Sequence, residues 1–98
     1  MNESPNDQVT NPVALLTAVA DPVRWAILRR LEGGEACVCD LRTEVAVAPN
    51  LLSYHLRVLR QTGLVTSTRR GRWIDYRLAD SAADHLEAAL PTARKVEP

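Results

Sequence analysis

The sequence lacks the features of membrane proteins and of secreted proteins rich in disulfides. No apolar run approaches the roughly 18–20 residues that a membrane span requires, and the polar residues 1–10 do not resemble a secretory signal peptide. Cys37 and Cys39 are the only cysteines, which is too few for a disulfide framework. We therefore expect a soluble, cytoplasmic protein that makes no membrane contact.

The chain also lacks net charge, because 12 basic residues balance 12 acidic ones, and total charge therefore indicates no partner. At 98 residues it is too short for a doubly wound or barrel enzyme. It contains no nucleophile–base pair, paired carboxylates or phosphate loop, so we expect no enzyme. The charges are unevenly distributed, however: residues 57–77 contain six arginines and one aspartate. This segment is a candidate cationic surface.

Helix signals begin at residue 11. Asn11-Pro12 and Asp21-Pro22 each supply a capping side chain followed by proline at the first helical position. A short helix over 38–45 follows, and Pro49 and Asn50 start a fourth that ends at Gly63. Helical spacing predicts these inward stripes on the first two helices: Val13, Leu16 and Ala20, then Val23, Ile27 and Leu31, with Arg24 off the stripe.

The period changes from 3.6 to 2 after Gly63. Residues 64–68 and 73–78 are rich in β-branched and aromatic side chains, which predicts a hairpin with the arginine-rich tip 69–72. Residues 81–90 then fit a last amphipathic helix that Pro91 ends. We expect one domain over 11–90, between a disordered tail (1–10) and a short C-terminal tail (91–98).

The order of helix, helix, short helix, helix, hairpin and helix is that of a winged helix-turn-helix, a mainly α fold with a β-hairpin wing. Four segments carry a closer likeness: ADPVRWAIL (20–28), EACVCDL (35–41), LSYHLRVLR (52–60) and GRWIDYRL (71–78). In this order they resemble the motifs of the ArsR/SmtB family of metal-sensing transcriptional repressors, over about residues 13–90. The resemblance implies a regulator, most often a repressor, that binds double-stranded operator DNA as a homodimer through its first and last helices.

The fourth helix and the hairpin tip supply the expected DNA contacts. Polar groups on the helix side away from the leucines can meet base edges, and arginines at the tip can neutralise phosphates or enter a minor groove. The apolar stripe of the fourth helix is Leu52, His55, Leu56 and Leu59, which favours a buried histidine at position 55 over a base contact. The alternative is a solvated helix face and an ordinary turn. The predicted DNA-binding residues are Asn50, Leu51, Ser53, Tyr54, Arg57, Arg69, Arg70 and Arg72.

The cysteine pair is the first candidate ion site. Cys37 and Cys39 lie too close in sequence for an ordinary unstrained disulfide, so we expect free thiols. By the family resemblance they match two of three sulfur ligands in arsenite and antimonite sensors, whereas Arg42 occupies the third position. We expect As(III) or Sb(III) to bind here and release the DNA; the alternative is two small buried residues without a function. No ion is expected to be required for folding.

The last helix is the second candidate ion site. The family's zinc site pairs an aspartate, matched by Asp80, with a histidine at a position where this chain has Ala82. The standard zinc site is therefore absent, and a displaced site for Ni(II) or another divalent ion such as Zn(II) would use Asp80, Asp84 and His85. Solvated surface charges are the alternative for these residues. Two further hypotheses stay open: a redox switch at the cysteines, and a regulator that requires an accessory protein.

Overall fold

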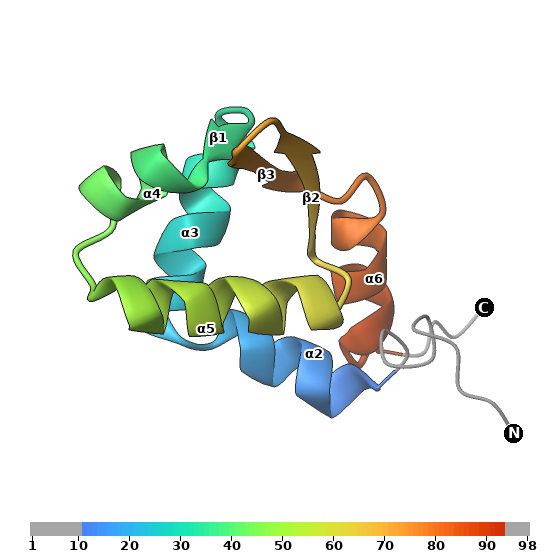
Figure 1. Cartoon of the computed structure of the whole chain (residues 1–98). Helices are drawn as coiled ribbons and strands as arrows, with labels where there is room; N and C mark the ends of the chain where they lie inside the picture. Colours follow the sequence, from blue (N-terminus) through green and yellow to red (C-terminus); the bar gives the residue numbers. More distant parts are fainter. Residues whose placement is uncertain (1–10, 94–98) are drawn as a thin grey trace, which may run out of the picture.

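The computed structural model describes residues 11–93, so the expected tail 1–10 and residues 94–98 lie outside the described part. The predicted order of elements is confirmed, with one added strand (Figure 1). Along the chain the elements are α2 (Pro12–Val19), α3 (Pro22–Glu32), β1 (Ala36–Cys37), α4 (Val38–Glu44), α5 (Pro49–Gln61), β2 (Val65–Arg70), β3 (Trp73–Leu78) and α6 (Ala82–Ala89). This is the winged helix-turn-helix architecture, with α4 and α5 as the helix-turn-helix pair and β2–β3 as the wing.

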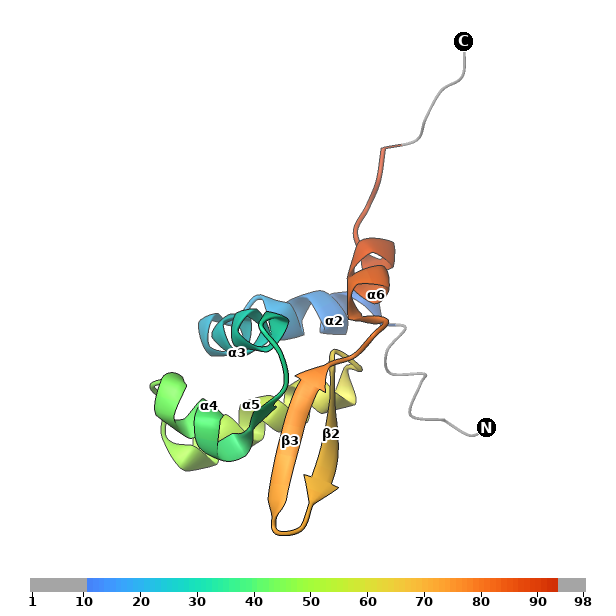
Figure 2. The same cartoon turned by 90° about the horizontal axis from the view of Figure 1, so that it is seen from above.

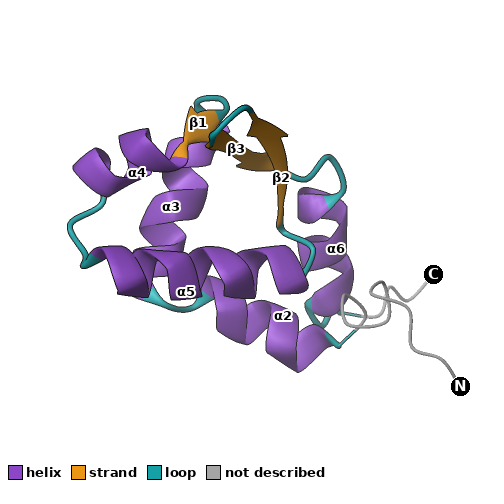
Figure 3. Ribbon diagram, in the orientation of Figure 1, coloured by secondary structure: helices purple, strands orange, loops and turns teal. Residues whose placement is uncertain are grey.

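The sheet has three strands where the sequence predicts two. The strand order is β1-β3-β2 (Figure 3), with antiparallel pairing throughout. Ala36 pairs with Tyr76, and Cys37 pairs with Asp75. A strand of two residues is too short to show an alternating pattern, which is why the sequence does not predict β1. The addition matters because it attaches the cysteine segment to the wing.

The wing is longer, and its tip tighter, than the sequence predicts. Val65 pairs with Leu78 at the base and Arg70 with Trp73 at the far end, so Arg69 and Arg70 belong to β2. Only Gly71 and Arg72 make the turn, and Gly71 has φ +63°, a value that glycine adopts without strain. In Figure 2 the hairpin projects away from the helices.

The helices enclose a core made mostly of leucines. On α5 the predicted stripe is confirmed, because Leu52, Leu56 and Leu59 are fully buried and His55 lies among them. The α2 stripe is wrong: Leu15 and Ala18 are buried, whereas Val13 is 71% exposed. Most residues of α2 are apolar, so the sequence pattern does not distinguish its inner face from its outer face.

Arg24 is the second correction to the predicted core. Helical spacing places it off the apolar stripe of α3, yet it is buried, as are Ile27 and Leu31 of the same helix. Its guanidinium finds hydrogen-bond acceptors inside the protein, which offsets the cost of burying a charge. Sequence periodicity does not show such acceptors because they come from other elements.

Both predicted helix caps are present. Asn11 Oδ1 accepts a hydrogen bond from the Ala14 backbone at 3.0 Å, and Asp21 Oδ2 accepts from the backbones of Val23 at 2.9 Å and Arg24 at 3.0 Å. The backbone hydrogen bond from Arg24, together with the positive charge of Arg24, lowers the pKa of the Asp21 carboxyl below 3.8. Asp21 therefore stabilises the start of α3 in its ionised form.

We expect Asp21→Ala to lower the free energy of unfolding by about 1 kcal/mol at neutral pH, because it removes the cap of α3. The lowered pKa in the folded state means that the charge stabilises the protein above pH 3.8 and that this contribution is lost as the pH falls through the folded pKa. Urea unfolding of both proteins at several pH values measures the difference. A gap between them that stays constant down to about pH 2 would contradict the assignment.

Candidate DNA-binding face and ion site

The structure brings the five predicted residues of α5 to one exposed side of the helix. This side lies opposite the buried leucines, and even its larger side chains are open to solvent, with Leu51 47% and Tyr54 46% exposed. Because the hydrogen-bonding groups on this side are exposed, they are available to bind base edges. The exposed residues are Asn50, Leu51, Ser53, Tyr54 and Arg57.

Arg42 joins this face, although the sequence singles it out only as the residue at the third sulfur position of the ion site. A shallow groove between α4 and α5 is lined by Arg42 together with Asn50 and Ser53. The signal in the sequence is its position on the helix that precedes the recognition helix, since the first helix of a helix-turn-helix crosses the DNA backbone. Arg42 therefore adds a positive charge next to two predicted DNA-binding residues.

The three wing arginines differ in their surroundings. Arg70 forms a two-point ion pair with Asp75 across the hairpin, at 2.7 Å and 3.1 Å. This pair lowers the pKa of the Asp75 carboxyl and raises that of the Arg70 guanidinium. The Arg69 side chain donates to the Gly71 carbonyl at 3.4 Å, and within residues 11–93 Arg72 has no ion pair or side-chain hydrogen bond. Arg72 thus presents the least compensated charge of the three.

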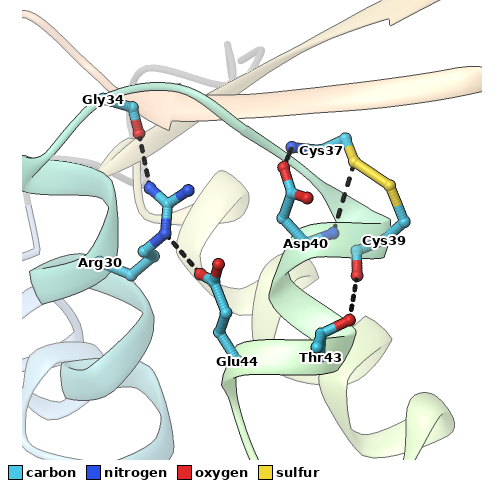
Figure 4. Close-up of polar contacts among 7 residues, drawn as sticks. All are labelled: Arg30, Gly34, Cys37, Cys39, Asp40, Thr43 and Glu44. Atoms are coloured by element: carbon cyan, nitrogen blue, oxygen red, sulfur yellow. Dashed lines mark hydrogen bonds and ion pairs between the residues drawn. A yellow bond between two sulfur atoms is a disulfide. The ribbon is translucent and has the colours of Figure 1, made fainter.

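The cysteine pair is joined by a disulfide, and the expectation of free thiols is therefore wrong for this structure (Figure 4). Cys37 has an extended backbone, with φ −82° and ψ 163°, and Cys39 lies in the first turn of α4. The change of direction at the helix start brings the two Cα atoms to 5.3 Å, within the usual range of about 4.4–6.8 Å for disulfides. Sequence separation alone does not reveal this geometry.

Asp40 completes a group of three donors with the two cysteines. Its backbone N–H donates to Cys37 Sγ at 3.4 Å, and its carboxylate accepts from the Cys37 backbone at 3.4 Å, forming a reciprocal cap at the start of α4. One ligand atom from each of Cys37, Cys39 and Asp40 lies within 4.8 Å of the others. Sequence reasoning missed Asp40, although its spacing of three from Cys37 is the signature of such a cap.

Polar contacts fix α4 beside this group. Arg30 of α3 binds Glu44 near the end of α4 and donates to the Gly34 carbonyl at 3.2 Å, while Thr43 donates to the Cys39 carbonyl at 3.1 Å (Figure 4). The donor group thus lies between the wing, through β1, and a helix that is held to α3. A change in the positions of the sulfurs would act on both neighbours.

The candidate residues in α6 and just before it, Asp80, Asp84 and His85, do not form a comparable group. Asp80 is paired with Arg77 at 2.9 Å, and Asp84 is exposed in the first turn of the helix. His85 is half-buried, and its Nδ1 is buried without a hydrogen-bond partner among the described residues. Across residues 11–93, Cys37, Cys39 and Asp40 are the group whose ligand atoms lie close enough to share an ion. In the same range no helix has the length and apolar character needed to cross a membrane.

Comparisons with known proteins agree with this architecture. Residues 21–67 match the family described as bacterial regulatory protein, arsR family. The chain is 43% identical to the HTH-type transcriptional repressor SmtB of Mycobacterium tuberculosis H37Rv over 74% of this chain and 53% of that protein. It is 33% identical to the arsenical resistance operon repressor of Bacillus subtilis 168, over 88% of this chain and 83% of that protein.

The structural comparison extends over more of the chain. The crystal structure of NolR from Sinorhizobium fredii is similar with a TM-score of 0.70 and 32% identity, over 90% of this chain and 91% of that one. The chain spans about half the length of the mycobacterial SmtB that it matches. Sequence motifs, fold and relatives lead to one conclusion: this chain belongs to the ArsR family of bacterial regulatory proteins.

Proposed function

We propose that this protein is a transcriptional repressor that binds operator DNA as a homodimer. The observation that carries the proposal is the exposed face of α5, which presents polar side chains and Arg57 beside an arginine-bearing wing. An α-helix fits the major groove, and a wing at its flank reaches the adjacent backbone. The mycobacterial SmtB and the Bacillus subtilis relative are described as repressors, which supports this direction of control.

The dimer is supported by the outer surfaces of two helices. α2 and α6 pack against each other at one end of the molecule (Figure 2). Val13 on α2 is 71% exposed and Leu90 at the end of α6 is 52% exposed, so apolar surface remains for a second copy to cover. A two-fold axis here places two recognition helices on one face of the DNA.

Footprinting on the DNA upstream of the protein's own gene tests the proposal. A dimer that uses two α5 helices protects two symmetric half-sites whose centres are about one helical turn, or a multiple of it, apart. A single protected half-site would contradict the dimer. Binding without any preferred sequence would contradict base recognition by α5.

We further propose that a thiophilic ion, As(III) or Sb(III), binds Cys37, Cys39 and Asp40 and releases the DNA. The donor set supports this, because soft thiolates select such ions and a carboxylate oxygen supplies a third ligand near the sulfurs. Arg42, which stands at the position of the third sulfur ligand, lines the α4–α5 groove. In this proposal the Asp40 carboxylate supplies the third ligand in its place. The disulfide must first be reduced, since two bonded sulfurs do not offer thiolates.

Direct binding measurements on the reduced protein test the ion site. We expect one As(III) per chain, with the loss of two reactive thiols, and weaker binding by Asp40→Asn. The same titration of oxidised protein should show no binding. Binding that is equally tight to reduced and oxidised protein would place the ion elsewhere.

The release mechanism follows from linkage. An ion that binds the DNA-free conformation more tightly lowers DNA affinity by the same factor, and coupling of about 1–3 kcal/mol corresponds to a release of about 5- to 150-fold. The site lies at the start of α4, the first helix of the helix-turn-helix. A displacement of this helix changes the distance between the two recognition helices of the dimer.

The disulfide favours a second candidate, a redox-responsive repressor. A hydroperoxide removes two electrons from the two thiols, which forms the Cys37–Cys39 bond and releases water and the corresponding alcohol, or a second water from hydrogen peroxide. In this case DNA affinity changes between the reduced and oxidised forms without any ion. Equal affinity of the two forms would exclude it.

The third candidate is a divalent-ion response at α6. The buried Nδ1 of His85, which has no partner among the described residues, is the observation that supports Ni(II) or Zn(II) at Asp80, Asp84 and His85. A partner subunit would have to complete this donor set, because the three residues do not converge within one chain. None of the relatives named above is described as acting with an accessory protein, and we do not propose one.

The ion pair in the wing predicts different effects for two arginines. We expect Arg72→Ala to lower the slope of log Kd against log salt by the amount that about one phosphate contact contributes. Arg70→Ala should lower this slope by less, because Asp75 already compensates the charge of Arg70. Titrations at several salt concentrations measure both slopes. Equal changes in slope would show that DNA displaces Asp75 from Arg70.

A further inference from the structure

A buried polar network lies directly beneath the recognition helix. Arg24 of α3 is 8% exposed and His55 of α5 is 9% exposed, and these are the buried charged or polar residues of the described chain. Arg24 Nη1 lies 2.9 Å from His55 Nδ1. Arginine has no acceptor, so the guanidinium donates and His55 Nδ1 accepts. The neutral imidazole therefore carries its proton on Nε2.

The same guanidinium also holds the end of α2. Arg24 Nε donates to the Ala18 carbonyl at 2.7 Å, and Nη2 lies 3.5 Å from the Thr17 carbonyl. Both carbonyls belong to the last turn of α2, where the Thr17 carbonyl also accepts from the Ala20 backbone at 3.2 Å. Arg24 thus joins the helix proposed for the dimer interface to the helix proposed for DNA recognition.

The network continues to the exposed face of α5. The rings of Tyr54 and His55 meet edge to face with centroids 5.1 Å apart. On the other side, Asp21 Oδ2 lies 3.9 Å from His55 Nδ1 while it caps α3. A continuous set of contacts therefore runs from the α2 carbonyls through Arg24 and His55 to a predicted DNA-binding side chain.

Stability alone gives little reason to bury such groups, because well-packed apolar residues of similar volume are commonly at least as stabilising. Directional hydrogen bonds, in contrast, fix the orientation of the elements that they join. We propose that Arg24 and His55 are positioning residues that set the angle of α5 against α2, and thereby the separation of the two recognition helices in the dimer. This inference rests on the proposed DNA-binding function. It assigns the preferred half-site spacing to the hydrogen bonds of Arg24 and His55.

The test compares His55→Phe, which keeps the ring and removes the acceptor, with His55→Asn, which keeps an acceptor near the position of Nδ1. Binding is measured on the native operator, on operators with one or two base pairs added or removed between the half-sites, and on a single half-site. For His55→Phe we expect about tenfold weaker binding to the native operator, a smaller loss or a gain at another spacing, and unchanged binding to the half-site. His55→Asn should restore the native preference.

Two controls separate positioning from general damage. Leu31→Val on α3 removes a buried methylene without touching the network, and it should lower stability while leaving the spacing preference intact. If thermal unfolding shows that His55→Phe does not fold, Arg24→Lys replaces it in the same binding measurements. Lysine keeps the charge but cannot bind the α2 carbonyls and His55 in the same fork geometry. We expect the same change of preference from Arg24→Lys.

An unchanged spacing preference in the folded variant would overturn the positioning role, as would an equal loss on every DNA, including the half-site. Either result leaves the proposed function intact if the wild-type protein binds two half-sites. Failure of the proposed function gives a different result, in which the wild-type protein itself has no preferred spacing.

Discussion

Replacing both Cys37 and Cys39 with serine is expected to abolish the release of DNA by arsenite while leaving the affinity of the reduced protein for DNA unchanged. The serine hydroxyls are too hard to replace two thiolates as ligands of a soft ion. Serine is also a favourable N-cap residue, so the hydroxyl at position 37 can keep the hydrogen bond from the Asp40 backbone. The start of α4 is thus preserved while the ion site is lost.

The double serine variant should lose the entire effect of arsenite on operator affinity, which is about 5- to 150-fold for a coupling of typical magnitude. Fluorescence anisotropy with labelled operator, with and without arsenite, measures it. Thr43→Ser is a matched control on α4, because it keeps the hydrogen bond to the Cys39 carbonyl and leaves the three donors untouched. A double serine variant that still responds fully would show that the ion acts at another site.

Arg57→Ala is expected to cause the largest loss of DNA affinity among the single substitutions on α5. Arg57 lies on the exposed side of the helix with Tyr54 and Ser53, and an arginine in the major groove reads a guanine through two hydrogen bonds. Loss of such a contact costs about 1–3 kcal/mol and relaxes the sequence preference at one position of each half-site. Titrations on operators substituted at single base pairs measure both effects.

Arg60→Ala is the matched control, because Arg60 is a second exposed arginine one turn further along α5, next to its end. We expect it to weaken binding to all sequences by a similar, smaller factor. If Arg57→Ala also acts equally on every sequence, Arg57 contacts phosphate and base recognition belongs to other residues. No change in either variant would contradict the proposed orientation of α5.

The sequence predicts well those elements whose signal is local. Apolar positions that recur at helical spacing identify α5 and its buried leucines, and proline after a capping residue identifies the starts of α2 and α3. The sequence pattern does not predict the inner face of α2, because nearly every position of that helix is apolar. The two residues of β1 have no pattern of their own and become a strand only because β3 lies beside them.

The site shows the same division between local and long-range features. The exposed face of α5 and the arginines of the wing follow from helical and strand periodicity, whereas the partners of individual charges depend on tertiary contacts. Arg24 is buried because carbonyls of α2 and a ring nitrogen of α5 converge on it, and Asp75 compensates Arg70 because the hairpin register places them together. The disulfide follows from the backbone turn at the start of α4, and sequence spacing alone argued against it.

Fluorescence anisotropy of the reduced protein on the DNA upstream of its own gene tests the central claim most directly, with arsenite, antimonite, Ni(II) and Zn(II) added in turn. We predict tight, sequence-specific binding by the protein alone and release by arsenite or antimonite. Release only by Ni(II) or Zn(II) would move the ion site to α6, around Asp84 and His85. Tight binding that is indifferent to all four ions would contradict an ion sensor at Cys37, Cys39 and Asp40.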